Sequence, residues 1–314
     1  MDRRDRVLAL AKRMNPDVTI SVSGDQCSDY LVLMNSGAFR RTKTPAYFRW
    51  FYRGSGRSML AVARGSDDTP VGQMGVRLCE MSCSLLGGLV TDMVTVPSRR
   101  GSGVFALLEQ VVEDWCRNEG ADLLYSFPNI AGARALIGAG HWAKVDEIRT
   151  LECNAQLLEP HKLSAGGTYE GLQLALSRPT IGVRRSAKEL AWRFQAHPEY
   201  KYREWPVSGS KLWTKIFTDP ASGENTVDLV SAGGLNPTEP HLLGEALAVL
   251  SSEGAVRFSA WAQPTAPDAE LLLTAGFYAG LQSRALCVRW LSSRAEQASL
   301  CLPWTVAQAD TEVF

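Results

Sequence analysis

The sequence predicts an α+β protein built from two tandem domains, with a local α/β order of strand, helix and strand in the first of them. A chain of 314 residues is too long for one ordinary hydrophobic core and suits two domains of about 150 residues each. Residues 91–127 have the pattern of a strand, a glycine-rich turn, a helix and a second strand. Two short signatures also occur twice, once in each half, which indicates a duplication.

The glycine-rich turn follows a predicted strand that ends near Val96. Gly101 and Gly103 lack the Cβ atoms that would keep an anion away from the backbone, and the first turn of the following helix leaves N–H groups without partners. Arg99 and Arg100 add two permanent positive charges beside these groups. The segment therefore predicts a site that binds a pyrophosphate.

Two common nucleotide motifs do not fit this turn. A Walker A loop needs Lys followed by Ser or Thr after its last glycine, and a dinucleotide fingerprint needs a third glycine three positions after the second. Here Gly103 is followed by Val104, Phe105 and Ala106. The turn therefore belongs to neither class.

The helix that opens at Val104 is predicted from the helical spacing of its apolar residues. These are Val104, Leu107, Leu108, Val111, Val112 and Trp115, with Glu109, Glu113, Asp114 and Arg117 on the other side. Gly120 is suited to end the helix in a left-handed conformation, and residues 121–127 then predict a short, mostly buried strand.

A second motif follows this strand. Asn129 comes at its end, small and apolar residues including Ala135 and Leu136 lie on the next predicted helix, and Gly140 and His141 close the block. Together with the turn, this block resembles the GNAT superfamily of acyl-CoA-dependent acyltransferases over roughly residues 60–150. The family pattern Gln/Arg-x-x-Gly-x-Gly/Ala is matched except at its first position, where Ser98 stands.

The resemblance implies a fold and a donor. Each domain would hold a mixed, mostly antiparallel sheet flanked by helices, and the fourth strand would splay from the fifth to admit the pantetheine arm of acetyl-CoA. The residues that the resemblance assigns to the donor are Val94, Thr95, Val96, Arg99, Arg100, Gly101, Ser102, Gly103, Val104 and Asn129.

Catalysis in this family needs a neutral acceptor amine and a polarised donor carbonyl. A main-chain N–H on the fourth strand would polarise the carbonyl, and a carboxylate would remove the proton from the amine, directly or through water. Asp92 is the candidate base because strand alternation places it on the face of Val94 and Val96, and Glu80 is the second candidate. A surface or turn role for Asp92 stays open.

The tyrosine with which many members of the superfamily protonate the leaving thiolate has no counterpart. Leu136 stands at its position, which leaves Tyr125, His141 or water as alternatives.

The duplication predicts domains at residues 1–158 and 168–314, joined by a linker around residues 161–168. Residues 48–52 recur loosely as residues 190–194, and residues 136–142 recur as residues 272–278. The second equivalent of the turn, at residues 231–241, has no arginine and contains two prolines, so the second domain is predicted to be degenerate and unable to bind coenzyme A.

Charge and composition exclude several classes of partner. Lys and Arg total 33, as do Asp and Glu, so no net field attracts nucleic acid or an anionic membrane. The seven cysteines lack Cys-x-x-Cys spacing, which argues for reduced thiols and against a zinc site or any other metal. No signal peptide and no apolar run of spanning length is present, so a cytoplasmic protein is expected.

The aromatic and basic run at residues 39–53 is interpreted mainly as helix packing, with acceptor recognition as the alternative.

The sequence thus favours an N-acetyltransferase that uses acetyl-CoA and a small amine. An amino sugar, free or nucleotide-linked, is the leading acceptor, because residues 47–52 and the sequence Phe-Pro-Asn at 127–129 resemble a GNAT subgroup of polysaccharide and nucleotide-sugar pathways. An amino acid, a polyamine or an antibiotic is the second alternative, and a non-catalytic binding or scaffold protein is the third. A homodimer stays open.

Overall fold

The computed structural model describes most of the chain, which divides into two compact units. The described residues are 2–22, 25–36, 42–54, 56–139, 141–159, 163, 180–207, 210–219, 221–231, 240–263, 267–306 and 308–310. Unit 1 comprises Met1–Val145, Ala196–Glu199 and Ala285–Leu300, and unit 2 comprises Asp146–Gln195, Tyr200–Arg284 and Cys301–Phe314. Each unit is described by itself.

Unit 1 contains a mixed sheet in the order β1-β2-β3-β4-β5-β11. Its strands are β1 (Thr19–Ser21), β2 (Ser58–Arg64), β3 (Pro70–Glu80), β4 (Leu86–Thr95), β5 (Leu123–Ser126) and the end of β11 (Tyr278–Trp290). The pair β4–β5 is parallel and the other pairs are antiparallel.

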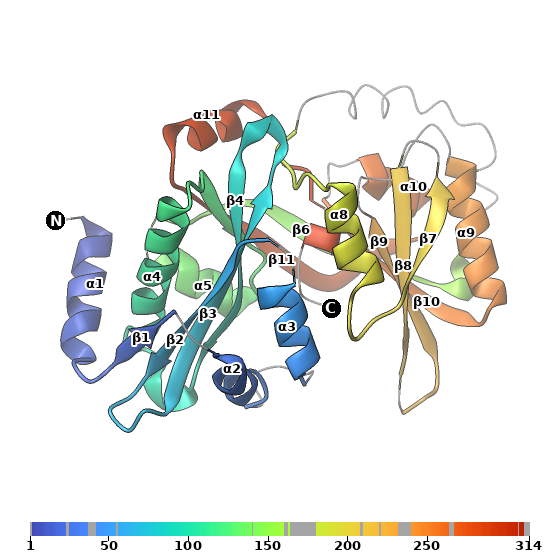
Figure 1. The fold of residues 1–314 in the computed structure, drawn as a ribbon. Coiled ribbons are helices and arrows are strands. Elements are labelled where there is room, and N and C mark those ends of the chain that lie inside the picture. Colours follow the sequence, from blue (N-terminus) through green and yellow to red (C-terminus); the bar gives the residue numbers. More distant parts are fainter. Residues whose placement is uncertain are drawn as a thin grey trace. The chain divides into compact units, whose positions relative to one another are not determined.

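Helices lie on both faces of this sheet (Figure 1). They are α2 (Cys27–Met34), α3 (Pro45–Arg53), α4 (Val104–Asn118) and α5 (Ile130–Ala139), whereas α1 (Arg3–Met14) packs against α4 and α11 (Ser293–Cys301) lies at one end of the sheet. A Cβ on Gly72 of β3 would contact Val104 and Leu108, whereas a Cβ on Gly75 would contact Tyr52. Because residues 72 and 75 face opposite sides of a strand, α4 and α3 cover opposite faces.

Helix α3 forms where the sequence predicts it. Pro45 occupies its first turn and the hydroxyl of Thr44 accepts the N–H of Tyr47, an N-cap that satisfies one free donor. Five aromatic residues of the helix are buried, namely Tyr47, Phe48, Trp50, Phe51 and Tyr52. Packing therefore accounts for the rings of these five residues, whereas residues 39–41 of the aromatic and basic run lie outside the described residues.

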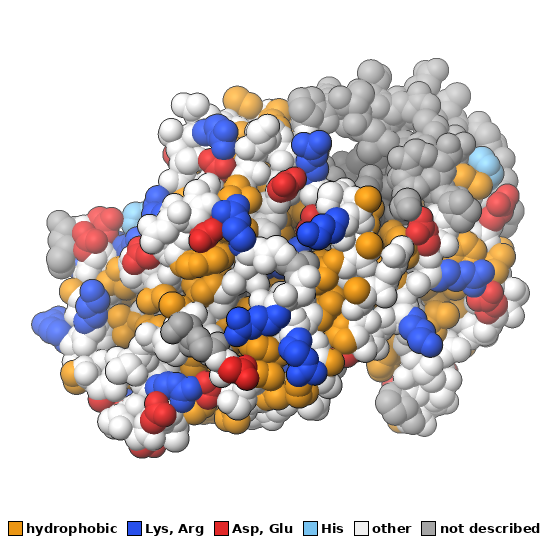
Figure 2. All heavy atoms as spheres, viewed as in Figure 1, with side chains coloured by type: hydrophobic (Ala, Val, Ile, Leu, Met, Phe, Trp, Pro, Cys, Tyr) orange, Lys and Arg blue, Asp and Glu red, His pale blue; other side chains and the backbone are white. Residues whose placement is uncertain are grey.

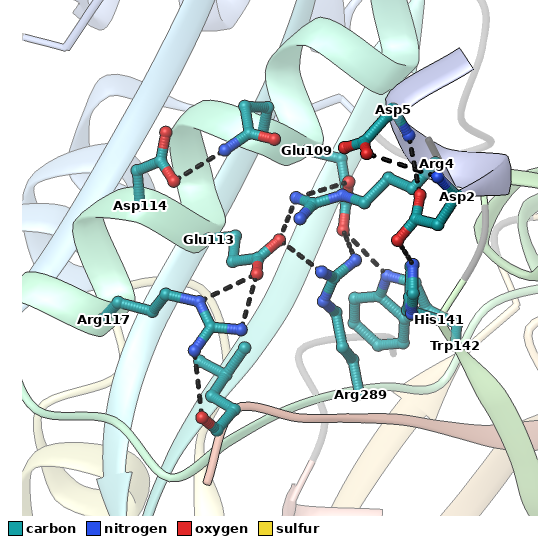
Figure 3. Close-up of polar contacts among 12 residues, drawn as sticks. Asp2, Arg4, Asp5, Glu109, Glu113, Asp114, Arg117, His141, Trp142 and Arg289 are labelled. Atoms are coloured by element: carbon teal, nitrogen blue, oxygen red, sulfur yellow. Dashed lines mark hydrogen bonds and ion pairs between the residues drawn. The ribbon is translucent and has the colours of Figure 1, made fainter. Parts of the chain in front are cut away.

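Helix α4 begins at Val104 and ends before Gly120, as expected, but two of the four residues on its polar face are buried. Glu109 and Glu113 are each 1% exposed, because α1 covers this face and Arg289 of β11 reaches it from the sheet. Arg289 contacts Glu109 at 2.9 Å and Glu113 at 2.7 Å, and Arg4 of α1 pairs with Glu113 (Figure 3). The two glutamates are thus covered by other parts of the chain, although they belong to the polar side of the helix.

Unit 2 has a sheet of the same kind. Residues 278–284 of β11 lie next to β6, and the order continues β6-β10-β9-β8-β7. The strands are β6 (Ala143–Asn154, in this unit from Asp146), β7 (Tyr202–Val207), β8 (Ser210–Thr218), β9 (Asn225–Ser231) and β10 (Ala255–Ala262). The pair β9–β10 is parallel, whereas β6–β10, β7–β8 and β8–β9 are antiparallel.

The helices of unit 2 are α8 (Ala187–Leu190), which continues into a π-helical turn at Ala191–Gln195, α9 (Pro240–Ser252) and α10 (Pro267–Thr274). The core between α9, α10 and the sheet includes Leu247, Phe258 and Leu271. The prediction of an α+β protein with mixed, mostly antiparallel sheets flanked by helices is confirmed.

The two sequence halves share one order of elements, but their last strands change places. Each half runs through three strands, a helix, a strand, a helix and a final strand. The strand that follows α5 is β6, which lies mainly in unit 2, and the strand that follows α10 is β11, whose end pairs with β5 in unit 1. The units therefore differ from two consecutive ranges at 1–158 and 168–314, and most of the predicted linker lies outside the described residues.

Candidate active site

The strands β4 and β5 stop pairing midway along β4. Their register pairs Gly87, Gly88 and Leu89 with residues 123–125, and the hydroxyl of Ser126 donates to the carbonyl of Val90 at 2.8 Å. Beyond Val90, β4 continues to Thr95 without a strand on its β5 side in the described part of the chain. The backbone edge of these last residues is open to a ligand that can supply hydrogen bonds.

A β-bulge lies in this unpaired part of β4. The register with β3 pairs Gln73 with Val94 and Gly75 with Thr91, so Asp92 and Met93 together oppose one residue of β3. Asp92 has φ of 50°, a left-handed conformation. Val94 pairs with Gln73, on the face of Gly75 and of the Tyr52 hydroxyl that bonds Asp92, whereas Met93 and Val96 pack in the core beneath α4. The predicted common face of Asp92, Val94 and Val96 is therefore wrong for Val96.

The bulge directs the side chain of Asp92 into a buried polar cluster beneath α3. The hydroxyl of Tyr52 donates to Oδ2 of Asp92 at 2.8 Å, and the hydroxyl of Tyr30 also interacts with this carboxyl. Burial raises the pKa of Asp92, whereas the charge of Lys43 and the two phenols act to lower it, and the net direction is upward. A side chain at Gly75 would displace Tyr52, so this glycine is what admits the phenol.

The turn after β4 presents backbone donors. Gly101 has φ of 76° and Gly103, the N-cap of α4, has φ of 95°, so both adopt the left-handed conformation that favours glycine. The amides of Gly101, Gly103, Val104 and Phe105 make no hydrogen bond to the residues that the structure describes. Unpaired amides at the start of a 15-residue helix are suited to bind an anion.

Helix α1 packs against this turn and donates a hydrogen bond to it. A Cβ on Gly103 would lie 2.6 Å from Cβ of Ala11, so the glycine is required for the approach of α1. Asn15, which caps α1, donates through Nδ2 to the carbonyl of Ser102 at 2.7 Å. The hydroxyl of Ser102 donates to the carbonyl of Arg99 at 2.7 Å, which fixes the turn internally.

The two arginines of the turn have different surroundings. Arg99 donates to Asp17 at 2.8 Å, and the charge of Asp67 also acts on it. Arg100 donates only its Nε, to the carbonyl of Thr95 at 3.2 Å, and its other guanidinium nitrogens have no partner among the described residues. Arg100 is therefore the cation that can bind a phosphate without first losing an ion pair.

The backbone of Val96 is already engaged. Its N–H donates to Val71 at 3.0 Å and its carbonyl accepts the N–H of Arg99 at 3.0 Å. Among the predicted backbone partners of the pantetheine arm, the amide of Val96 is thus occupied, and Val94 and Thr95 remain as the candidates in β4.

The other predicted residues are dispersed. Glu80 is exposed at the far end of β3, five residues from Gly75 and so roughly 16 Å along the strand from the Asp92 cluster. Asn129 uses Oδ1 to accept the N–H of Gly132 at 2.8 Å and thus caps α5. Its amide nitrogen remains a donor.

The candidates for the general acid lie in different parts of unit 1. Leu136 is fully buried in the core beneath α4, and Tyr125 is buried on β5 with its ring close to Gly87. His141 is exposed and lies 3.2 Å from Asp2 of the N-cap of α1, so it belongs to the surface. Tyr125 is the one of these side chains on the sheet.

The second equivalent of the turn, residues 231–241, lies largely outside the described residues, so the degeneracy of the second domain stays a prediction.

The sequence analysis does not identify Tyr30 and Tyr52 as neighbours of the candidate base, or Gln73 as a polar residue in the interior of the sheet. The interpretation of residues 39–53 as helix packing is correct for the ring of Tyr52 but not for its hydroxyl. A signal for Gln73 was available, because a single amide in the apolar strand 70–80 is a polar residue in a core position.

The described residues were compared with the requirements of a metal site and of a membrane-spanning helix. They contain no group of three or more His, Cys, Asp or Glu that could hold a metal ion. None of the helices seen in them is long and apolar enough to cross a membrane. On the face drawn in Figure 2, basic and acidic side chains are interspersed.

Comparisons with known proteins bear on the fold. No family model matches the chain, and no curated protein matches it. Among solved structures, the chain is similar to a GCN5-related N-acetyltransferase from Anabaena variabilis ATCC 29413, with a TM-score of 0.63 and 10% identity over 90% of this chain and 75% of that chain. It is also similar to Eis1 from Mycobacterium abscessus, with a TM-score of 0.58 and 12% identity over 90% and 75% of the two chains.

A third similar structure is a fungal multi-domain GH3 beta-N-acetylglucosaminidase with a GCN5-related glucosamine N-acetyltransferase region. The TM-score is 0.57 at 14% identity, and the match covers 86% of this chain but spans 38% of that one. The chain therefore has the fold of the GCN5-related N-acetyltransferases, as the resemblance of its motifs implies. At these identities the likeness shows the fold alone.

Proposed function

We propose that the protein transfers an acetyl group from acetyl-CoA to the amine of a small molecule. The observation that carries the proposal is the separation of β4 from β5 after Leu89, in a strand that leads directly to the unpaired amides at the start of α4. An open strand edge and an anion site in sequence match the two parts of coenzyme A, an amide-bearing arm and a diphosphate.

The turn fits a diphosphate in both charge and space. The amides of Gly101, Gly103 and Val104 supply donors, and Arg100 supplies a guanidinium with free nitrogens. A Cβ at Gly101 would have no atom within 4 Å, so the outer side of the turn is open. Arg99 is expected to act at longer range, since Asp17 holds it.

Asp92 supports a general-base step in this proposal. The acceptor nitrogen attacks the acyl carbon, the N–C bond forms, the C–S bond breaks and the coenzyme leaves as a thiolate. Asp92 takes the proton from the nitrogen, and the thiolate is protonated by solvent or by a neighbouring acid. The burial that raises the pKa of Asp92 makes it a stronger base than an exposed carboxylate, and Tyr52 orients it.

The acceptor is proposed to be an amino sugar, free or nucleotide-linked. Support comes from the resemblance of residues 127–129 to a subgroup of polysaccharide pathways and from the glucosamine N-acetyltransferase region named for the fungal neighbour. Amino acids, polyamines and antibiotics form the second acceptor class, and a binding or scaffold protein without turnover is the third alternative.

A thiol-release assay with acetyl-CoA and a panel of amines tests the proposal. We expect release of free coenzyme A with at least one amine, and a fall in kcat of about 100-fold or more in Asp92→Asn with an unchanged KM for acetyl-CoA. Glu80→Gln is the matched control, because it removes an exposed carboxylate of the same unit. Binding of acetyl-CoA without turnover of any amine would favour the scaffold alternative, and the absence of binding would refute the donor site.

A further inference from the structure

Gln73 is a buried polar residue that has no partner in the described protein. Its side chain lies in the middle of β3 and the residue is 1% exposed, yet neither Nε2 nor Oε1 makes a hydrogen bond to the residues that the structure describes. Burying a carboxamide without partners is unfavourable, and nearly all such groups in native proteins are satisfied. The partner of Gln73 is therefore expected to be a molecule other than the protein.

The position of Gln73 identifies the kind of molecule. Residues 73 and 75 of a strand share one face, and the face of Gly75 is the one on which the hydroxyl of Tyr52 lies. That hydroxyl donates to Asp92 at 2.8 Å. Gln73 is also paired with Val94, the first residue of β4 after the bulge. It thus lies in the same layer as the candidate base, where β4 has lost its β5 neighbour.

The other polar groups in this layer already interact with the protein. Tyr52 donates to Asp92, Tyr30 interacts with the same carboxyl, and Lys43 lies over the ring of Tyr47 at 3.4 Å from its centre. Among the described residues of this layer, Gln73 is the one whose side-chain donor and acceptor remain available to a ligand.

A carboxamide offers one acceptor and two donors side by side. An amine with a hydroxyl on the adjacent carbon presents the complementary pair, an N–H donor and an oxygen acceptor at similar spacing. A simple alkylamine presents the donor alone and would leave Nε2 buried without a partner. Sites of this kind discriminate strongly against an analogue that lacks the hydrogen-bonding group.

We infer, on the basis of the proposed function, that Gln73 binds the acceptor and selects a vicinal amino alcohol, the grouping found in 2-amino sugars. Its Oε1 accepts an N–H of the acceptor amine and its Nε2 donates to the neighbouring hydroxyl oxygen. Asp92 takes the proton that the nitrogen releases on attack.

The first test measures whether Gln73 has a structural partner. Gln73→Met keeps the length of the side chain and removes both polar atoms, so the full chain should melt at the wild-type temperature or above it. Gln26→Met is the matched control, because Gln26 is also buried in unit 1 but donates to the carbonyl of Ser21 at 3.0 Å. This control should lower the melting temperature.

The second test measures selectivity by thiol release at saturating acetyl-CoA. Paired acceptors are 2-aminoethanol against ethylamine, and trans-2-aminocyclohexanol against cyclohexylamine, with D-glucosamine as a sugar. The wild type should favour each amino alcohol at least tenfold in kcat/KM, as roughly expected for one good hydrogen bond. Gln73→Met should reduce this ratio to near one by raising the KM for the amino alcohol, with the KM for acetyl-CoA unchanged.

The outcomes separate the two proposals. Equal turnover of the paired amines by the wild type, or equal selectivity in Gln73→Met, overturns the role of Gln73 and leaves acetyl transfer standing. A lower melting temperature in Gln73→Met than in Gln26→Met also overturns it, since Gln73 would then have a structural partner. No thiol release with any amine refutes the proposed function, and the acceptor role falls with it.

Discussion

The substitution Arg289→Met should severely destabilise unit 1, because it removes the cation between two buried carboxylates. Arg289 is 3% exposed and contacts Glu109 at 2.9 Å and Glu113 at 2.7 Å (Figure 3). Methionine fills most of the aliphatic volume but carries no charge. Glu113 would keep Arg4 and Arg117, and Glu109 would keep Trp142, which donates at 3.1 Å, together with the more distant Arg4.

The magnitude follows from burial. Breaking a buried ion pair by removing one partner costs about 3–5 kcal/mol, because the other charge stays in a medium that solvates it poorly. For domains of this size the loss corresponds to a fall in melting temperature of about 6–20 °C. The matched control is Arg117→Met, whose side chain is 46% exposed and pairs with Glu113. It should cost less than about 1 kcal/mol.

The loss should depend on pH in a defined direction. Burial raises the pKa of Glu109 above its ordinary value of 4.5 in the folded state, and Arg289 and Arg4 oppose this rise. A carboxyl with a raised folded-state pKa favours the fold below its unfolded pKa, and this contribution is lost as pH rises through the folded value. Removing Arg289 raises the folded pKa further, so the variant should be closest to wild type near about pH 5 and furthest from it near about pH 8.

Urea unfolding of the full chain at several pH values, followed by tryptophan fluorescence, measures both effects. Adding Glu109→Gln and Glu113→Gln to Arg289→Met should recover most of the stability, since no carboxylate then stays buried without its cation. A loss below about 1 kcal/mol in Arg289→Met, or one that does not change with pH, would show that these carboxylates are solvated and would refute the reasoning.

Other substitutions test the donor site and the construction of unit 1. Arg100→Glu should weaken acetyl-CoA binding at least about tenfold in calorimetry while the melting temperature stays unchanged, and an unchanged affinity would exclude the turn as a phosphate site. Asp17→Asn should tighten the same binding about two- to fivefold, because it frees Arg99, and a weaker complex would contradict this role for the ion pair. Gly103→Ala should lower stability by more than about 1 kcal/mol, since φ of 95° and the approach of α1 both disfavour a Cβ, and a wild-type melting temperature would argue against this packing. A fragment of residues 1–158 should fail to give a cooperative unfolding transition, because it lacks the part of β11 that pairs with β5, and a folded fragment would refute the dependence on the C-terminal strand.

The strand, turn and helix at residues 91–118 could be predicted because their signals are local. Gly103 and Val104 set the start of α4, and Gly120 sets its end. The exposure of Glu109 could not be predicted, since it depends on Arg4 and Arg289, which are distant in the sequence. A polar stripe on a helix predicts solvent only when no second element covers that stripe.

The residues that surround the candidate base could not be predicted from the sequence, for a different reason. Strand alternation predicts which residues share a face only while the strand is regular, and the bulge at Asp92 breaks it. A non-glycine residue with positive φ gives no local signal in the sequence. Asp92 remains the candidate base, and its neighbours Tyr30 and Tyr52 lie on α2 and α3, which are distant from β4 in the sequence.

The last strand of the second sequence half completes the sheet of unit 1, because the end of β11 pairs with β5. The strands β6 and β11 follow the helices α5 and α10 at the same place in the order of elements, so the sequence does not say which unit each strand completes. In the structure, Cys287 packs in the core of unit 1, and Arg294 contacts Asp122 at 2.6 Å at the start of β5. Unit 1 is thus closed by residues from the end of the chain. The sheet that carries Asp92 and leads to the turn at residues 99–104 therefore depends on a strand that is about 190 residues distant in the sequence, which no local signal could predict.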